Sequence, residues 1–200
     1  MFYYLEGTVA VLEAGVAVLD VGGIGFKCYT TANSQSYLEI GKKARLYTYC
    51  NIKEDAFDLY GFHEMSEKRS FEMLLGVSGV GPKAALSILS AVTPEDMAMA
   101  VITDNEKAFT AAPGIGRRIA QRIILELKDK VAKENAAVQP AGTVRPGGVG
   151  MPGAKLADAA SALAVLGYSQ SEITAALRTI DVESLTVEEI IRQVLKASVK

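Results

Sequence analysis

A short glycine-rich motif occurs twice in this chain, 35 residues apart. The first copy reads LGVSGVGPKAA at 75–85, and the second reads TAAPGIGRRIA at 110–120. Both copies contain a glycine, an apolar residue, a second glycine and, two residues further on, a cation. These positions are Gly79, Val80, Gly81 and Lys83 in the first copy and Gly114, Ile115, Gly116 and Arg118 in the second. Helical sequence flanks both copies, so each is predicted to form a helix, a tight turn and a second helix.

The motif combines features that bind a phosphate group. Glycine permits positive φ and the close approach of another backbone, because it has no Cβ. The second helix presents N–H groups that lack partners, together with the positive end of its dipole. Arg117 and Arg122 add to the positive charge near the second turn. Two such turns in tandem indicate that the ligand is a nucleic-acid backbone, bound without reading its base sequence.

Helix packing, ATP binding and catalysis are other roles that such a motif could have. A turn that only packs two helices would explain either copy alone, but it would not need a cation at the same position in both. Neither copy contains the Gly-Lys-Ser/Thr sequence of an ATP-binding P-loop. A DNA glycosylase would need a catalytic acid downstream of the motif, and only Glu134 lies near that distance. No carboxylate cluster suggests a metal-dependent nuclease, so we expect no catalytic activity, cofactor or metal.

Length and charge limit the architecture. A chain of 200 residues allows two or three small domains. The formal net charge of −2 argues against a uniformly basic surface, yet five cations face only two acids between Pro113 and Lys130. The two cysteines and the single histidine suggest neither a disulfide framework nor a zinc site. Because no secretory signal or membrane-spanning apolar run is evident, we expect a cytoplasmic protein.

The chain is predicted to contain three domains and a linker. Residues 1–63 alternate between apolar and polar positions over about five short strands, which favours a closed barrel of the OB type. Residues 64–133 are helical and contain both glycine turns. Residues 134–154 include five glycines and three prolines, which indicates a flexible linker. Residues 155–200 are predicted to form a three-helix bundle.

Local signals mark several helix starts and the barrel. Thr93, followed by proline and two acids, is an N-cap sequence. Capping boxes are expected at three further helix starts, namely Thr103 with Glu106, Ser169 with Glu172, and Thr186 with Glu189. Eleven of the fourteen aromatic residues lie within 1–62. They could stack on the bases of a single strand, or they could simply reflect the preference of aromatic residues for strands.

The order of these parts resembles the RuvA family of bacterial Holliday-junction branch-migration proteins over essentially the whole chain. The two glycine motifs, LYGF at 59–62 and LAVLGY at 163–168 carry the resemblance. It implies a multidomain protein with an N-terminal all-β OB-type barrel and a central all-α tandem helix-hairpin-helix domain. A C-terminal three-helix, UBA-like bundle would follow on a flexible linker.

The resemblance also implies a function. It implies a homotetramer that holds an unfolded four-way DNA junction on one face, without catalysis of its own, in DNA recombination, DNA repair and the SOS response. A hexameric ATPase motor of the RuvB type would be a partner, and a second tetramer and a RuvC-type resolvase stay open. The implied DNA contacts are Gly79, Val80, Gly81, Lys83, Gly114, Ile115, Gly116, Arg117, Arg118 and Arg122.

Two further sets of residues acquire a role through the resemblance. Glu54 and Asp55 lie at the tip of a predicted hairpin, where acids are ordinary turn residues. In the family the matching pair is an acidic pin that repels phosphates at the centre of the junction. In the bundle, the implied contacts with the motor are Leu163, Leu166, Tyr168 and Leu195. Leucines in so small a bundle are equally expected in its core.

A generic adaptor is the alternative to the junction protein. In that case the barrel and hairpins would deliver a nuclease to structured DNA, and the protein would be a monomer or a dimer rather than a tetramer. Candidates for the contacts between subunits of a tetramer are exposed apolar strand edges and the helix around Phe71, Met73 and Leu74.

Overall fold

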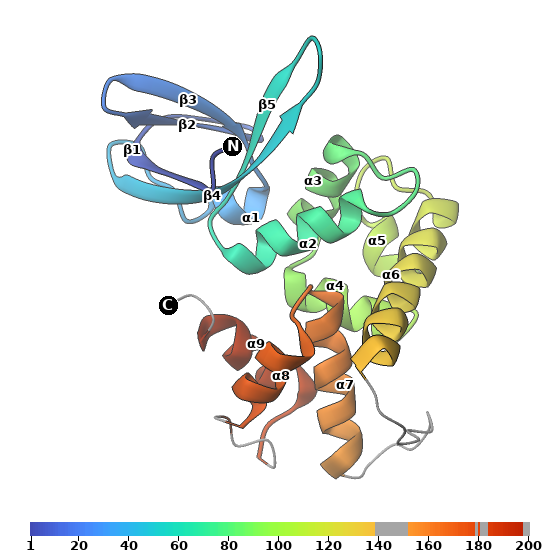
Figure 1. Cartoon of the computed structure of the whole chain (residues 1–200). Helices are drawn as coiled ribbons and strands as arrows, with labels where there is room; N and C mark the ends of the chain where they lie inside the picture. Colours follow the sequence, from blue (N-terminus) through green and yellow to red (C-terminus); the bar gives the residue numbers. More distant parts are fainter. Residues whose placement is uncertain (139–151, 179, 181–183, 198–200) are drawn as a thin grey trace.

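The N-terminal part of the chain is a closed five-stranded barrel (Figure 1). The computed structural model describes residues 1–138, 152–178, 180 and 184–197. The strands are β1 (Tyr4–Glu13), β2 (Val16–Val21), β3 (Ile24–Tyr29), β4 (Lys43–Ile52) and β5 (Phe57–Phe62). Around the barrel they follow the order β1-β2-β3-β5-β4, and all neighbours are antiparallel except β3 with β5. The predicted OB-type barrel is confirmed.

Apolar side chains that alternate along the strands fill the barrel. Leu5, Val9 and Leu46 are at most 6% exposed. Cys28 on β3 and Cys50 on β4 are also buried and form no disulfide. Burial raises the pKa of the Cys28 thiol to about 12. This thiol therefore stays protonated at neutral pH, and it behaves as a small apolar side chain.

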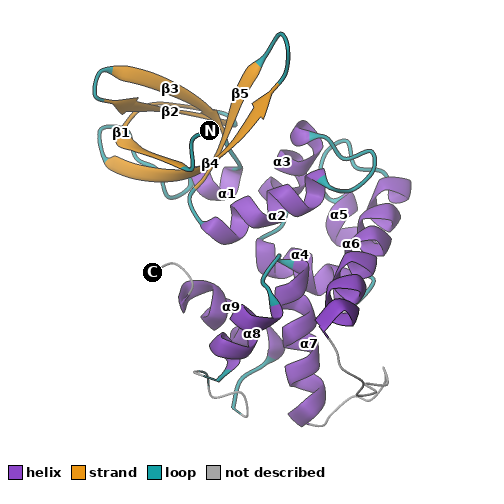
Figure 2. Ribbon diagram, in the orientation of Figure 1, coloured by secondary structure: helices purple, strands orange, loops and turns teal. Residues whose placement is uncertain are grey.

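Helices make up the regular structure of the rest of the described chain (Figure 2). The short helix α1 (Ala32–Gln35) connects β3 to β4. The central domain contains α2 (Met65–Leu75), α3 (Pro82–Ala91), α4 (Pro94–Ile102), α5 (Glu106–Thr110) and α6 (Arg117–Val138). The C-terminal bundle contains α7 (Pro152–Val165), α8 (Gln170–Leu177) and α9 (Val187–Ala197).

Three of the four predicted caps are confirmed, those at Thr93, Ser169 and Thr186. The fourth is wrong. Thr103 ends α4 instead of starting a helix, and its hydroxyl donates to the carbonyl of Met99 at 2.8 Å. Asp104 then takes a left-handed φ of 56°, so the chain turns before α5 begins at Glu106. The Glu106 side chain is consequently available for a contact outside its own helix start.

The helices on both sides of the predicted linker are longer than expected. α6 continues to Val138 and α7 begins at Pro152, so both ends of the segment 134–154 are helical. Glutamate and alanine after residue 133 are good helix formers, and proline suits the first turn of a helix. The remainder of the expected linker, 139–151, lies outside the described residues.

One hydrophobic core extends from the central domain into the C-terminal bundle. The helix α7 of the bundle lies beside α4 and α6 (Figure 1). Met97 of α4 and Leu163 of α7 are both fully buried in this core. Arg69 of α2 adds a polar contact between the two parts. Its guanidinium lies 4.4 Å from the ring centroid of Tyr168, and its Nη2 lies 3.3 Å from Oε1 of Glu172. The bundle is therefore docked on the central domain through an apolar face with a charged edge.

Of the two surfaces that the sequence suggested for contacts between subunits, one is exposed and the other is largely buried. On the strands of the barrel, large apolar side chains such as those of Val11, Ile52 and Phe57 are exposed, so contacts at exposed apolar strand edges stay a prediction. Phe71 and Leu74 are fully buried, and Met73 is partly buried. The expectation for this helix is wrong, because its apolar groups are already used within the protomer.

A buried carboxylate joins the barrel to the central domain. Glu67 of α2 is 5% exposed. Its oxygens accept hydrogen bonds from the hydroxyls of Thr31, at 2.5 Å, and Ser34. The Ser34 oxygen also accepts a hydrogen bond from the backbone N–H of His63 at 2.7 Å. Burial raises the pKa of Glu67, and the two hydroxyl donors oppose the shift.

The free energy of unfolding of the Glu67→Gln variant should rise relative to that of the wild type as the pH rises. The folded-state pKa of Glu67 is raised, so its contribution is fully present below its unfolded pKa of about 4.3 and is lost as the pH rises through the folded pKa. Urea unfolding of both proteins at about pH 5 and about pH 8 measures this change. Glu39→Gln, an exposed substitution on the barrel side, is the control. A free-energy difference that is the same at both pH values would contradict the prediction.

Candidate nucleic-acid interface

The two glycine turns have the same backbone geometry. Gly79 and Gly114 take φ values of 85° and 83°, a conformation that favours glycine because a Cβ is strained there. α3 begins directly after Gly81, and α6 begins directly after Gly116. The prediction of a helix, a tight turn and a second helix is confirmed at both places.

The apolar residue of each turn anchors it in the core. Val80 is 5% exposed and Ile115 is 6% exposed. Their N–H groups donate to the carbonyls of Val77 and Ala112, each at 3.1 Å. Because these donors are already engaged and the side chains are buried, Val80 and Ile115 can support a nucleic-acid contact only by holding the turn in place.

The outer surface of each turn is open to a ligand. A Cβ added at Gly81 or Gly116 would meet no heavy atom within 4 Å. Lys83 and Arg118, the second residues of α3 and α6, are exposed and bind no other described residue. The N–H groups of Lys83 and Ala84 in α3, and those of Arg117 and Arg118 in α6, have no acceptor in their own helix. An anion at either turn would therefore meet backbone donors, a helix N-terminus and one unpaired cation.

The two hairpins hold each other through a pair of equivalent hydrogen bonds. Ser87 Oγ on α3 donates to the carbonyl of Pro113 in the second turn at 2.8 Å. Arg122 Nη1 on α6 donates to the carbonyl of Ser78 in the first turn at 3.3 Å. The two donors, Ser87 and Arg122, are 35 residues apart, and so are the two acceptors, Ser78 and Pro113. The two bonds are therefore equivalent under the repeat. Glu126 accepts a further bond from the Ser78 N–H at 3.1 Å. Both glycine turns thus belong to one unit with approximate two-fold symmetry.

The four candidate cations are not equivalent. Arg122 supports the first turn, as described, whereas Lys83 and Arg118 are unpaired among the described residues. Arg117 Nε donates to Glu106 Oε2 at 2.9 Å, and its side chain is still 79% exposed. Hydrogen bonds from Gln121 and then Arg117 lower the pKa of Glu106, although partial desolvation opposes them. This carboxylate consequently stays charged at neutral pH.

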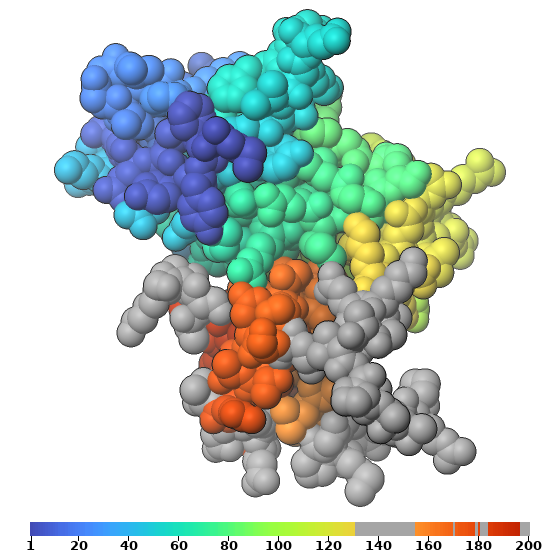
Figure 3. All heavy atoms as spheres, in the orientation of Figure 1, coloured from blue at the N-terminus to red at the C-terminus, as the bar shows by residue number. Residues whose placement is uncertain are grey.

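Glu54 and Asp55 lie at the tip of the β4–β5 hairpin, which projects beyond the barrel (Figures 1 and 3). The turn is closed by a hydrogen bond from the Lys53 N–H to the carbonyl of Ala56 at 2.8 Å. Both acids are exposed and bind no other described residue. The hairpin therefore holds two negative charges away from the body of the protein.

The four candidate motor contacts are buried. The exposed fraction is zero for Leu163 and Leu166, 3% for Leu195 and 4% for Tyr168. All four belong to the core that the bundle shares with the central domain. In this arrangement they support packing, and a partner could contact their side chains only after that packing changed.

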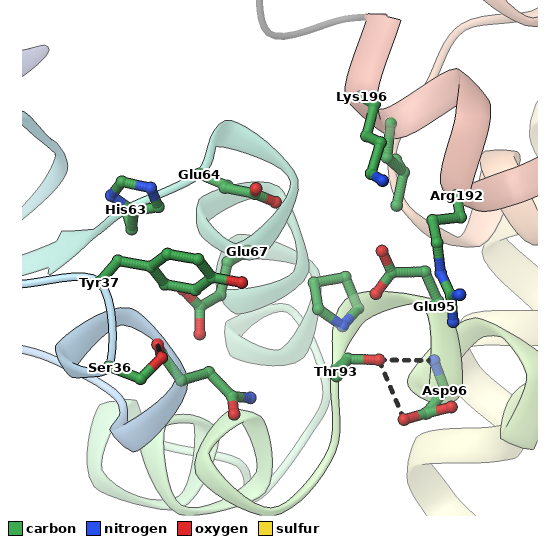
Figure 4. A pocket seen from close by; sticks show the side chains of 13 residues that line it. Ser36, Tyr37, His63, Glu64, Glu67, Thr93, Glu95, Asp96, Arg192 and Lys196 are labelled. Atoms are coloured by element: carbon green, nitrogen blue, oxygen red, sulfur yellow. Dashed lines mark hydrogen bonds between the residues drawn. The ribbon is translucent and has the colours of Figure 1, made fainter.

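A cavity of about 300 Å³ lies between the barrel, α2, α4 and α9 (Figure 4). Acids from α4 and from around the start of α2 face cations of α9 across it, and the charged lining residues include Glu64, Glu67, Glu95, Asp96, Arg192 and Lys196. Opposite charges thus meet where the three parts of the chain join. Neither glycine turn lines this cavity.

Two other classes of site are not found in the described part of the chain. It contains no group of three or more histidine, cysteine, aspartate or glutamate residues that could hold a metal ion. No single described helix is long and apolar enough to cross a membrane. Only α3 and α4 taken together, with a bend of 94° between them, meet the same length and composition limits.

Sequence reasoning missed three residues of this interface. Ser87 lies 35 residues before Arg122, so the repeat itself contains the signal that pairs these two positions. Glu126 has no such signal, because the position 35 residues before it is Ala91, whose side chain cannot accept a hydrogen bond. The capping pattern assigns Glu106 to a helix start, and nothing near it in the sequence indicates that it faces Arg117.

Serine should affect thermal stability differently at the two glycines of each turn. Gly79→Ser and Gly114→Ser place a Cβ at positive φ, which costs about 1–2 kcal/mol each and should lower the melting temperature by roughly 2–8 °C. Gly81→Ser and Gly116→Ser fit into open space, and serine is a good N-cap, so these variants should melt like the wild type. Thermal unfolding followed by circular dichroism measures the difference.

The second pair of variants should nevertheless bind linear duplex DNA less tightly, because their side chains occupy the space through which a backbone approaches. Equal melting temperatures for all four variants would contradict the backbone argument. Undiminished DNA binding by Gly81→Ser and Gly116→Ser would contradict the placement of the ligand.

Three families of protein domains match successive parts of the chain. They are the RuvA N-terminal domain at 1–61, the SAM-like helix-hairpin-helix tandem at 71–129 and the RuvA C-terminal domain at 154–199. A relative from Acetivibrio thermocellus is 42% identical over 98% of each chain, and one from Caldanaerobacter subterraneus is 41% identical over the full length of both. Both are named Holliday junction branch migration complex subunit RuvA. From barrel to bundle, then, this chain belongs to the RuvA family.

Proposed function

We propose that this protein binds four-way DNA junctions as a homotetramer and connects them to an ATPase motor for branch migration. It would be a subunit without catalytic activity of its own, acting in the cytoplasm in DNA recombination and repair. Its relatives are named as subunits of a Holliday junction branch migration complex, which supports this proposal.

The observation that carries the proposal is the linked pair of glycine turns. Each turn offers one unpaired cation, Lys83 or Arg118, beside the N-terminus of a helix. The bonds between the hairpins limit their relative movement, so the two sites suit phosphates of a single duplex arm. Such contacts do not read bases. Four copies would provide one clamp for each arm, and preference for a junction would come from the symmetry of the assembly.

The barrel offers a surface for contacts between subunits. Ten of the eleven large apolar side chains that are strongly exposed among the described residues lie within the first 57 residues. Phe2 and Phe57 are 40% and 54% exposed, and their ring centroids are 6.2 Å apart. Exposed apolar groups of this kind favour association. Because Phe57 begins β5, a contact here would bring the tips of the β4–β5 hairpins of several subunits together.

Glu54 and Asp55 would then act as a repulsive separator. Four hairpin tips would surround the crossover with carboxylates, which repel DNA phosphates. Binding would be weaker at the centre and stronger along the arms, where Lys83 and Arg118 lie. The arms would stay apart, and base pairs could exchange between them.

The C-terminal bundle is the proposed site for a hexameric ATPase motor of the RuvB type. Leu163, Leu166, Tyr168 and Leu195 are its candidate contacts. Since all four are buried against the central domain, motor binding would require the bundle to rearrange. A second tetramer on the junction and a RuvC-type resolvase are further partners that the proposal allows.

A competition assay tests the central proposal. A labelled four-way junction is challenged with linear duplex of the same arm sequence, and the mass of the complex is measured in parallel. We expect a preference for the junction of about 10³-fold or more, with a mass that corresponds to a tetramer. Equal affinity for the two DNAs, shown by a monomer, would refute the proposal and leave the turns as general phosphate clamps.

Neutralising the hairpin tip should strengthen junction binding. The double variant Glu54→Gln, Asp55→Asn removes the repulsive charges, so we expect about tenfold tighter binding at low salt, a smaller gain at high salt and slower branch migration. Fluorescence anisotropy gives the affinities, with linear duplex as the control DNA because it lacks a crossover. If affinity, junction geometry and migration rate all stayed unchanged, the separator role would be wrong.

Tyr168→Ala should reduce stimulation of the motor ATPase by about tenfold without changing junction affinity. Because loss of a buried ring can cost roughly 3–5 kcal/mol, Tyr168→Phe is the matched variant that retains the ring. Helical content is followed by circular dichroism. Unfolding of the bundle in Tyr168→Ala, with normal stimulation by Tyr168→Phe, would assign Tyr168 a structural role only.

A further inference from the structure

A charged network lies beside the second glycine turn. Glu106, the first residue of α5, accepts a hydrogen bond from Arg117 Nε at 2.9 Å and another from Gln121 Nε2 at 2.8 Å. Both of its carboxylate oxygens are therefore engaged. The exposed fraction is 32% for the Glu106 side chain and 79% for that of Arg117. The ion pair is thus accessible to solvent and to a ligand at the start of α6.

The first glycine turn has no counterpart of this network. A shift of 35 residues takes Glu106 to Phe71, Arg117 to Pro82 and Gln121 to Leu86, and none of these three is charged. By contrast, the unpaired cations do match, because Lys83 and Arg118 occupy equivalent positions. At the second turn, Arg117 is therefore offset by Glu106. At the first turn, Arg122 and Glu126 of α6 bind the backbone of Ser78 and supply one charge of each sign.

We propose that Glu106 is a positioning residue that withholds Arg117 from the DNA backbone and thereby keeps the two phosphate sites similar in charge, an inference that rests on the DNA-binding function proposed above. While Arg117 is paired, each turn offers one free cation, Lys83 or Arg118. Two similar clamps can hold a duplex arm without fixing either phosphate. Such a balance suits a protein whose DNA must move during branch migration.

Glu106 has two opposing effects on DNA binding, and their relative sizes decide whether it strengthens or weakens the affinity. The carboxylate orients the guanidinium through Nε, which leaves the Nη groups of Arg117 free and would favour phosphate binding. Its negative charge, however, repels phosphate and competes for the same guanidinium. DNA affinity depends strongly on the number of cations that displace counterions from the backbone. The orienting effect of an exposed ion pair is weak, so the charge effect should dominate.

The test is the affinity of Glu106→Gln for a linear duplex and for a four-way junction over a range of salt concentrations. Glutamine keeps an oxygen for Arg117 Nε but removes the charge. We expect about two- to tenfold tighter binding to both DNAs at about 0.1 M salt, and a slope of log K against log salt that is steeper by up to about 0.9. Unchanged or weaker binding would overturn the proposal, and weaker binding would mean that Glu106 presents Arg117 to DNA.

Asp104→Asn is the matched control. This substitution removes an acid two residues before Glu106. Asp104 is paired with Lys128 on a later turn of α6, and the Lys128 Nζ lies 2.6 Å from the Asp104 carboxylate. Asparagine tolerates the left-handed φ of this position. Affinity and salt slope should stay close to the wild-type values. A gain equal to that of Glu106→Gln would show a general charge effect and overturn the specific role of Glu106.

A double variant isolates the dependence on Arg117. In an Arg117→Ala background, Glu106→Gln should produce little further gain, and a gain of undiminished size would overturn the proposal. If Glu106→Gln does not fold, Gln121→Leu takes its place. It leaves the charge of Glu106 and frees its second oxygen for Arg117, so DNA binding should become slightly weaker, and tighter binding would overturn the proposal. The wild-type preference for the junction, measured in the same titrations, tests the proposed function separately. Its absence would refute the junction proposal, while the duplex data would still decide the role of Glu106.

Discussion

Each glycine turn receives a hydrogen bond from the second helix of the other hairpin, Ser87 to Pro113 in one direction and Arg122 to Ser78 in the other. A tight turn with positive φ has few contacts of its own, so its position depends on what holds it from outside. Mutual support limits the movement of the two turns relative to each other. A backbone clamp needs this property, because two phosphates on one duplex are separated by a distance that DNA geometry sets.

The core beneath the turns repeats with the same spacing of 35 residues. Leu74 and Phe109, which precede the turns, are both fully buried, and so are Ile88 and Ile123 in the helices that follow. The central domain is therefore a duplicated unit that packs against itself. Equivalent buried side chains give the two turns equivalent support, which explains why the φ values of Gly79 and Gly114 differ by so little.

Charges of the two signs are concentrated at different places on the protein, although the net charge is small. The net charge of the chain is −2, yet unpaired cations stand at the glycine turns and unpaired acids at the tip of the β4–β5 hairpin. The barrel and the central domain are joined through Glu67, whose buried carboxylate links α2 to the segment around α1. This joint determines how the acidic tip is placed relative to the cationic turns, and so how attraction and repulsion would be combined on one DNA ligand.

The sequence by itself determined the local elements: the barrel strands, both glycine turns and the caps at Thr93, Ser169 and Thr186. These signals are contained within a few neighbouring residues, where φ, alternation and capping are decided. Only the tertiary structure decided which side chains meet. It paired Arg117 with Glu106, used Arg122 to support the first turn, and placed Phe71 and Tyr168 in the shared core. Such contacts depend on how elements distant in the sequence pack together. The sequence in and beside the motif supplied four cations, and the fold determined which of them are unpaired.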